Sequence, residues 1–108
     1  MQKELKRGLN LALMLRDYHS DFPPNGLSIF IMIASNEGLS STEIVEKLDL
    51  PKATVSRNLR MLGDRLSPDK EGMNLVRLEH DKRDYRVRRG YLTERGQDFL
   101  QKLTDCLK

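Results

Sequence analysis

The residues from His80 to Thr93, HDKRDYRVRRGYLT, constrain the fold more than any other part of this sequence. They form a charged turn between two runs, 74–80 and 85–92, that show period-two character and contain β-branched or aromatic residues. This pattern predicts an antiparallel hairpin. Residues 81–91 hold five basic and two acidic residues, so the turn of the hairpin carries a net charge of five minus two, or +3.

Two short helices are predicted before this hairpin. Ser40 and Glu43 stand at the spacing of a capping box, which predicts that a helix begins there. Pro51 suits the first turn of a second helix over residues 52–66. Two short helices joined by a tight turn predict a helix-turn-helix over residues 40–66.

The second of these helices has two different faces. Its apolar residues fall on one stripe, and small, polar and basic residues fall on the opposite face. Arg57 is therefore expected to point outward and to contact a base or a phosphate. The stripe is Val55, Leu59, Leu62 and Leu66, and the outer face is Ala53, Arg57, Arg60 and Asp64, with Thr54 beside them.

Three further helices are expected. Residues 3–18 have a helical period with an unusually wide apolar arc, which predicts burial on two sides, one of them against a second copy of the chain. The apolar run 27–35 fits a buried strand or a buried helix by its period alone, and Gly38 after it favours a helix. Thr93 is predicted to cap a last helix, whose residues 95–107 are the second expected dimerisation segment.

A helix-turn-helix followed by a hairpin is the layout of a winged helix. The sequence therefore predicts a mainly α fold with a small β-hairpin. This hairpin, over residues 74–92, is the wing. All 108 residues are expected to form one such domain. A cation at the wing tip can enter a narrow minor groove. We expect Arg86 to do so and Asp84, two residues earlier, to hold it in place.

The motifs over residues 27–100 resemble the MarR family of winged-helix transcription regulators. The segment LSSTEIVEKLDLPKATVSRNLRML is similar to the family's helix-turn-helix. The wing residues stand in the order of the family's D-x-x-D-R-R…LT-x-x-G signature, except that Tyr85 occupies a position where Arg is common. The matching residues are Asp81, Asp84, Arg86, Leu92, Thr93 and Gly96.

The resemblance implies a DNA-binding homodimer, most simply a repressor on a near-palindromic site in double-stranded DNA. Its recognition helix would contact DNA through Lys52, Thr54, Ser56, Arg57 and Arg60. Its wing would do so through Arg86, oriented by Asp84. From their own charge, the other wing cations are expected to contact phosphates without reading bases, or in one or two cases only to be solvated: Lys82, Arg83, Arg88 and Arg89. The dimer would form through Leu5, Leu9, Leu13, Leu100, Leu103 and Leu107.

Two departures from the family stand out. Family members usually run longer, so dimerisation here is expected to rest on residues 3–18 and 95–107. The segment 66–74 is longer than the usual connection to the wing and is expected to be a loop. The resemblance leaves open whether a small-molecule effector acts.

Other functional classes have little support in the residues. One cysteine and two histidines argue against a disulfide and a zinc site, and favour a reducing cytosol. No apolar run is long enough to span a membrane, and no catalytic constellation or cofactor motif is present. Cys106 is expected to be a packing residue, and the alternative interpretation is a redox-sensing thiol. The alternative function is a winged-helix module that binds another protein through residues 3–18.

Overall fold

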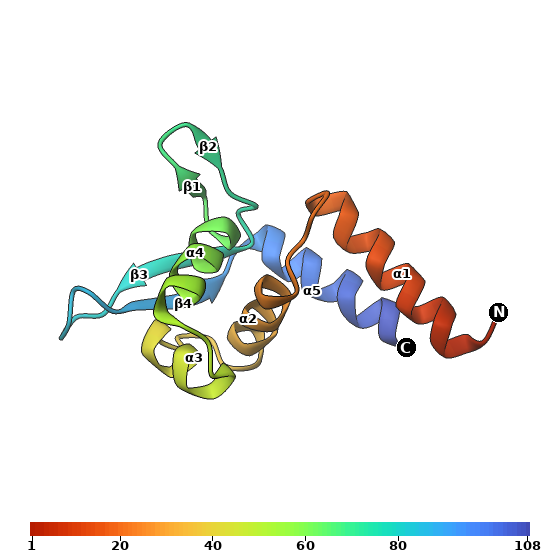
Figure 1. Cartoon of the computed structure of the whole chain (residues 1–108), viewed down its shortest axis with the longest axis horizontal. Helices are drawn as coiled ribbons and strands as arrows, with labels where there is room; N and C mark the ends of the chain where they lie inside the picture. Colours follow the sequence, from red (N-terminus) through yellow and green to blue (C-terminus); the bar gives the residue numbers. More distant parts are fainter.

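The structure is a computed structural model that describes all residues from Met1 to Lys108. It has five helices and two separate two-stranded antiparallel sheets (Figure 1). In chain order the elements are α1 (Lys3–Tyr18), α2 (Pro24–Ser35), α3 (Ser41–Leu48), α4 (Lys52–Leu62), β1 (Arg65–Ser67), β2 (Lys70–Glu71), β3 (Val76–His80), β4 (Arg88–Leu92) and α5 (Glu94–Leu107).

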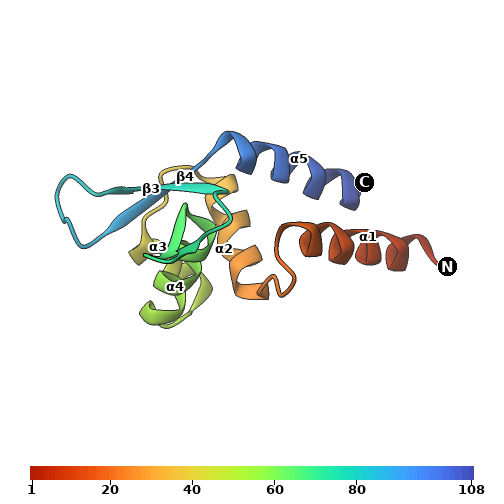
Figure 2. The same ribbon diagram turned by 90° about the horizontal axis from the view of Figure 1, so that it is seen from above.

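The molecule is elongated, and an aromatic cluster helps to join its two parts. Helices α1 and α5 lie side by side at one end, and α2, α3, α4 and the β3–β4 wing occupy the other (Figures 1 and 2). Phe99 of α5 is fully buried and contacts the rings of Phe30, Phe22 and Tyr18, with centroids 4.7, 5.6 and 4.8 Å away. These contacts connect α5 to α2 and to the end of α1.

The local signals at the helix starts are confirmed. The Ser40 hydroxyl accepts a hydrogen bond from the Glu43 N–H, and the Glu43 carboxylate accepts one from the Ser40 N–H, as a capping box requires. The Thr93 hydroxyl caps α5 by accepting from the Gly96 N–H. The apolar run 27–35 is helical, within α2. Together with the β3–β4 hairpin, these elements give the winged helix-turn-helix fold that the sequence predicts.

The wing is attached to the helix-turn-helix by backbone hydrogen bonds. Strands β3 and β4 pair from Val76↔Leu92 to His80↔Arg88. The segment before α3 adds to the outer edge of β4, because the Gly38 N–H donates to the Gly90 oxygen at 2.8 Å and the Gly90 N–H donates to the Leu39 oxygen at 3.1 Å. The wing base therefore has a fixed place beside α3.

The prediction for residues 52–66 is wrong at its end, and so is the prediction of a loop after it. Helix α4 ends at Leu62, and residues 65–71 form the small β1–β2 hairpin. The N–H groups of Met73, Leu75 and Asn74 donate to the oxygens of Met61, Leu62 and Gly63, each at 2.8 Å. These carbonyls lie at the helix end, where no intrahelical N–H remains for them. The returning chain satisfies them and ends the helix.

The structure contains no helix with the length and apolar character needed to cross a lipid bilayer. It also contains no group of three or more histidine, cysteine or acidic side chains placed to hold a metal ion.

Gly96→Ala should strongly destabilise the fold. A Cβ at Gly96 would collide with the backbone oxygen of Leu75, so we expect a loss of about 2–3 kcal/mol in the free energy of unfolding. Gly8→Ala is the matched control, because a Cβ at Gly8 meets no atom within 4 Å and alanine favours the helix. Chemical denaturation measures both. Equal stability of the two variants would contradict the close packing of α5 on the chain before β3.

Candidate nucleic-acid interface

The outer face of α4 carries the residues that the sequence assigns to DNA. Lys52, Ser56, Arg57 and Arg60 are exposed, and Thr54 is half-buried. The stripe on the opposite face is buried at Val55, Leu59 and Leu62, as the helical wheel predicts. Leu66, the last residue of the predicted stripe, lies on β1 instead and is half-buried.

A groove of about 680 Å³ runs along this face of α4. It is walled on the other side by Asp21, Pro23 and Asn25 at the start of α2. Asn58 lies on the floor of this groove and is 5% exposed. Its side-chain N–H donates to the Thr54 oxygen at 2.8 Å, which holds the asparagine against its own helix. The polar side chains of α4 thus border an open concave surface.

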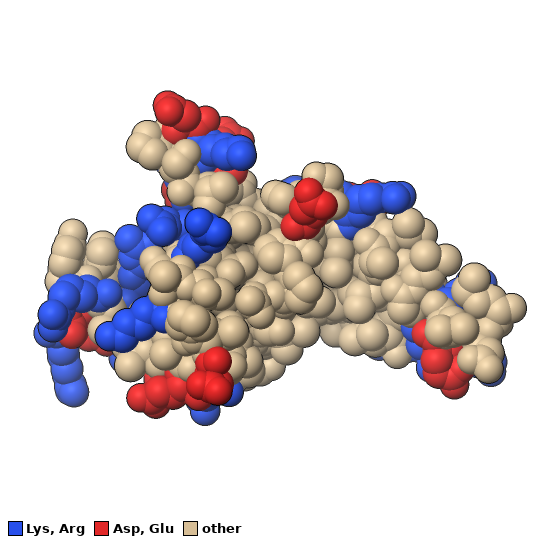
Figure 3. Space-filling view, viewed as in Figure 1, with Lys and Arg blue, Asp and Glu red and all other residues tan.

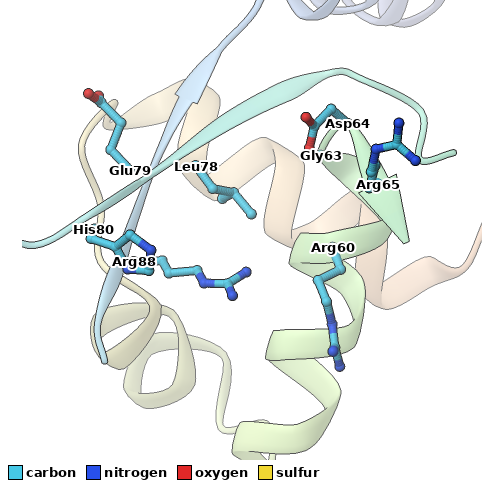
Figure 4. A pocket seen from close by; sticks show the side chains of 8 residues that line it. All are labelled: Arg60, Gly63, Asp64, Arg65, Leu78, Glu79, His80 and Arg88. Atoms are coloured by element: carbon cyan, nitrogen blue, oxygen red, sulfur yellow. The ribbon is translucent and has the colours of Figure 1, made fainter. Parts of the chain in front are cut away.

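A second hollow, of about 210 Å³, lies between α4 and the wing. Figure 4 shows Arg60 on α4 and Arg88 on β4, with the guanidinium of Arg88 directed toward α4. His80 lies beside Arg88, its partner in the β-ladder. The helix and the wing therefore bring two arginines into one concave site. The remaining lining residues are Gly63, Asp64, Arg65, Leu78 and Glu79.

The wing tip contains the ion pair that the sequence predicts. Arg86 Nε donates to the Asp84 carboxylate at 3.2 Å, and the backbone N–H of Arg86 donates to it at 3.0 Å. The Arg86 side chain is still 89% exposed. Hydrogen bonds from the side chain and then the backbone of Arg86 lower the pKa of the Asp84 carboxyl. The pair is therefore retained above the ordinary pKa of aspartate, and it is lost only as the pH falls through the lowered pKa.

Arg89 has a different environment from the other wing cations. Its guanidinium donates to the Asp81 carboxylate at 2.7 and 2.9 Å and to the Gly38 oxygen at 2.8 Å, and it lies 3.8 Å from Glu43. Asp81 itself is only 13% exposed, and its pKa is lowered by hydrogen bonds from the Arg83 N–H and then from the Arg89 side chain. The sequence places Arg89 among the DNA contacts, but its donors are engaged within the protein. We assign it a supporting role instead.

Among the remaining wing cations, Arg77 on β3 pairs with Glu79 at 3.1 Å, whereas Lys82, Arg83 and Arg88 make no ion pair. Lys82 and Arg83 are exposed, and Arg88 is half-buried. Figure 3 shows lysine and arginine side chains gathered over α4 and the wing, with acidic side chains over α3 on one side and over the β1–β2 hairpin on the other. The cationic surface is thus a band that spans both elements.

The leucines assigned to dimerisation fall into two groups. Leu5, Leu9 and Leu13 of α1 are 62, 46 and 40% exposed, and Leu107 of α5 is 56% exposed. Leu100 is half-buried against the core, and Leu103 is 4% exposed. Leu103 was expected at an interface but is inside the chain, because α1 packs against α5 there. Only the exposed leucines are available to a second copy.

Two features near this surface were missed from the sequence. Arg65 lines the hollow beside Arg60 because α4 ends early, a position that no helical pattern indicates. The rings of His80 and Tyr85 stack at the wing tip, with centroids 4.2 Å apart. His80 and Tyr85 are five residues apart, on either side of a turn. This spacing indicates the ring contact only when the register of the hairpin is known.

Arg89→Ala should lower the free energy of unfolding more than Arg88→Ala does, because it removes hydrogen bonds to the Asp81 carboxylate and to a backbone oxygen. Arg88→Ala removes the same side chain at the next position, where it has no ion pair, and should change stability by less than about 0.5 kcal/mol. Urea denaturation of both variants checks this. If Arg88→Ala cost as much as Arg89→Ala, the assignment of a supporting role to Arg89 alone would be wrong.

Comparison with known proteins agrees with this geometry. Residues 24–64, which cover α2, α3 and α4, match a family model described as a helix-turn-helix domain. No curated protein sequence matches the chain.

The solved structures similar to this one include a MarR transcriptional regulator from Methanosarcina mazei Go1, with a TM-score of 0.73 at 17% identity over 92% of this chain. YusO from Bacillus subtilis gives 0.72 at 17% identity over 95%. A mutant of S. aureus MepR bound to an oligodeoxyribonucleotide gives 0.73 at 19% identity over 96%.

This chain spans 64, 66 and 70% of the lengths of those three chains, respectively. At these identities the likeness concerns the fold. The wing signature and the structural match agree in this respect: the chain has the winged helix-turn-helix fold of MarR-type transcriptional regulators.

Proposed function

We propose that this protein is a DNA-binding transcriptional regulator that grips two adjacent grooves of a duplex. The observation that carries the proposal is the hollow shared by Arg60 of α4 and Arg88 of β4. This hollow brings a cation of α4 and a cation of the wing to one concave site, which Asp64 and Glu79 also line. The helix-turn-helix match and the DNA-bound structure of the similar MepR mutant support the same function.

In this proposal α4 enters the major groove. Its exposed residues Arg57, Arg60 and Ser56 face the bases and the phosphates, while Lys52 and Thr54 lie at its first turn. An arginine bidentate to guanine contributes roughly 1–3 kcal/mol of discrimination between base pairs. We assign this role to Arg57, which is exposed at the middle of the helix and has no ion pair within the chain.

The wing tip enters the adjacent minor groove through Arg86. Its pairing with Asp84 restricts the rotamers of an otherwise exposed side chain, which lowers the entropy lost on binding. A narrow minor groove over A·T base pairs has the negative potential that attracts such an arginine. Lys82, Arg83 and Arg88 are assigned to phosphates around the groove.

The protein would act as a homodimer and, most simply, as a repressor. The exposed row of Leu5, Leu9 and Leu13 runs along α1 on the side opposite the core, and Leu107 of α5 is also exposed. A continuous apolar row of this kind favours burial against a partner. In a two-fold dimer the two α4 helices would lie about 34–36 Å apart and read a near-palindrome.

Duplex binding tests the cationic surface. Selection from genomic fragments supplies a bound sequence, and fluorescence anisotropy then measures affinity against salt. Arg57→Ala should relax sequence preference by about 5–150-fold, which corresponds to 1–3 kcal/mol. Arg86→Ala should weaken binding mainly at A·T-flanked sites and reduce the slope of log affinity against log salt by about 0.9.

Lys3→Ala is the control, because Lys3 is an exposed cation at the start of α1, at the end of the molecule away from the wing (Figure 1). It should leave affinity unchanged. Specific binding that survives the combined substitution of Arg57, Arg60 and Arg86 by alanine would contradict the proposed roles.

Light scattering after size exclusion tests the dimer. The wild-type protein should have twice the chain mass of 12.5 kDa, and Leu9→Glu should have the mass of one chain, because it places a charge in the apolar row. Asn10→Glu adds the same charge at the next, polar position of α1 and should remain dimeric.

A wild-type monomer would contradict the homodimer. It would favour the alternative function, in which the exposed leucines of α1 bind a different protein within a larger nucleoprotein complex.

A further inference from the structure

The tip of the wing displays two side chains, not one. The Val87 N–H donates to the Asp84 oxygen at 2.9 Å, which closes a four-residue turn, and the Asp81 N–H donates to the Val87 oxygen at 2.8 Å below it. Tyr85 and Arg86 are the two central residues of this turn. Tyr85 is 75% exposed, and the Arg86 side chain is 89% exposed.

Each of these two side chains is held in place by a neighbouring residue. Asp84 holds Arg86, as described above. His80, the last residue of β3, holds Tyr85: the two rings are 4.2 Å apart between centroids with an interplanar angle of 13°, and His80 Nδ1 lies 2.8 Å from the Tyr85 backbone oxygen. An exposed aromatic side chain held in one place loses little conformational entropy when it meets a partner.

The Tyr85 hydroxyl has no hydrogen-bond partner within the protein. Its surroundings are cationic, because the segment 81–91 carries five basic residues against two acidic ones. An unpaired hydroxyl donor in such surroundings is complementary to a phosphate oxygen, and tyrosine is among the side chains that donate to DNA phosphates.

We propose that Tyr85, positioned by His80, is a second DNA contact of the wing and donates a hydrogen bond to a phosphate bordering the groove that Arg86 enters. This inference rests on the proposed function. The inference adds to that function an uncharged contact, which fixes the position of the wing on the DNA without reading a base.

Tyr85→Phe in the full-length protein tests the contact, because it keeps the ring and its stack and removes only the hydroxyl. On a mixed-sequence duplex about three helical turns long, we expect affinity to fall about five- to tenfold, as for the loss of one hydrogen bond to a charged oxygen. The same fall should appear on the selected sequence, since a phosphate contact carries no sequence information. The salt slope should not change, because no charge is removed.

Tyr91→Phe is the matched control. Tyr91 lies on β4 against Gly38 and Arg77, away from the turn, and losing its hydroxyl should leave affinity unchanged. Wild-type affinity in Tyr85→Phe would overturn the inference. If Arg86→Ala still weakened binding in the same experiment, the proposed function would stand without the Tyr85 contact. A wild-type protein that binds no duplex would overturn both.

A double-mutant cycle tests the role of His80. His80→Ala should weaken binding about threefold or more in the wild-type background and have almost no effect in Tyr85→Ala, because His80 acts on DNA through the tyrosine ring. Thermal unfolding is measured in parallel. An equal loss of affinity in both backgrounds would overturn the positioning role, since it would mean that His80 acts on its own or through general stability.

Discussion

The position of the wing depends on one junction, the guanidinium of Arg89. It bonds the Asp81 carboxylate at the start of the wing loop and the Gly38 oxygen before α3, and it lies close to the Glu43 carboxylate of the capping box. Residues far apart in the sequence thereby converge on a single cation. Two hydrogen bonds, to the Asp81 carboxylate and to the Gly38 oxygen, and a 2.7 Å ion pair with Asp81 fix this guanidinium in place. The junction therefore ties the wing to the helix-turn-helix.

Three arginines of the wing have different environments. Arg89 is committed to the structure, and Arg86 is exposed but aimed by Asp84. Arg88 shares a hollow with Arg60 of the recognition helix. The two aspartates of the wing do not cancel the positive charge: each accepts hydrogen bonds from one arginine and from the backbone of the loop. A cationic surface with a defined shape results, which supports the proposed gripping of two grooves.

The sequence anticipated the local features well and the connections less well. The capping box at Ser40, the cap at Thr93 and the Asp84–Arg86 pair follow from interactions within a few residues. The early end of α4 at Leu62 does not, because residues that follow much later in the chain take over its last carbonyl groups. The burial of Leu103 likewise depends on where α1 packs, since its own helical face is no different from that of an interface leucine.

By itself, the sequence determined which segments are helices, where most of them begin, and which face of α4 is polar, because periodicity and capping act over one or two turns. Only the tertiary structure decided which cations remain free for a ligand. Arg88 and Arg89 are neighbours of the same type on one strand, yet alternate residues of a strand point to opposite faces. The Arg88 side chain therefore lies toward the recognition helix, and the Arg89 side chain lies toward Asp81 and Gly38. Which arginine faces which side depends on the register and packing of the whole wing.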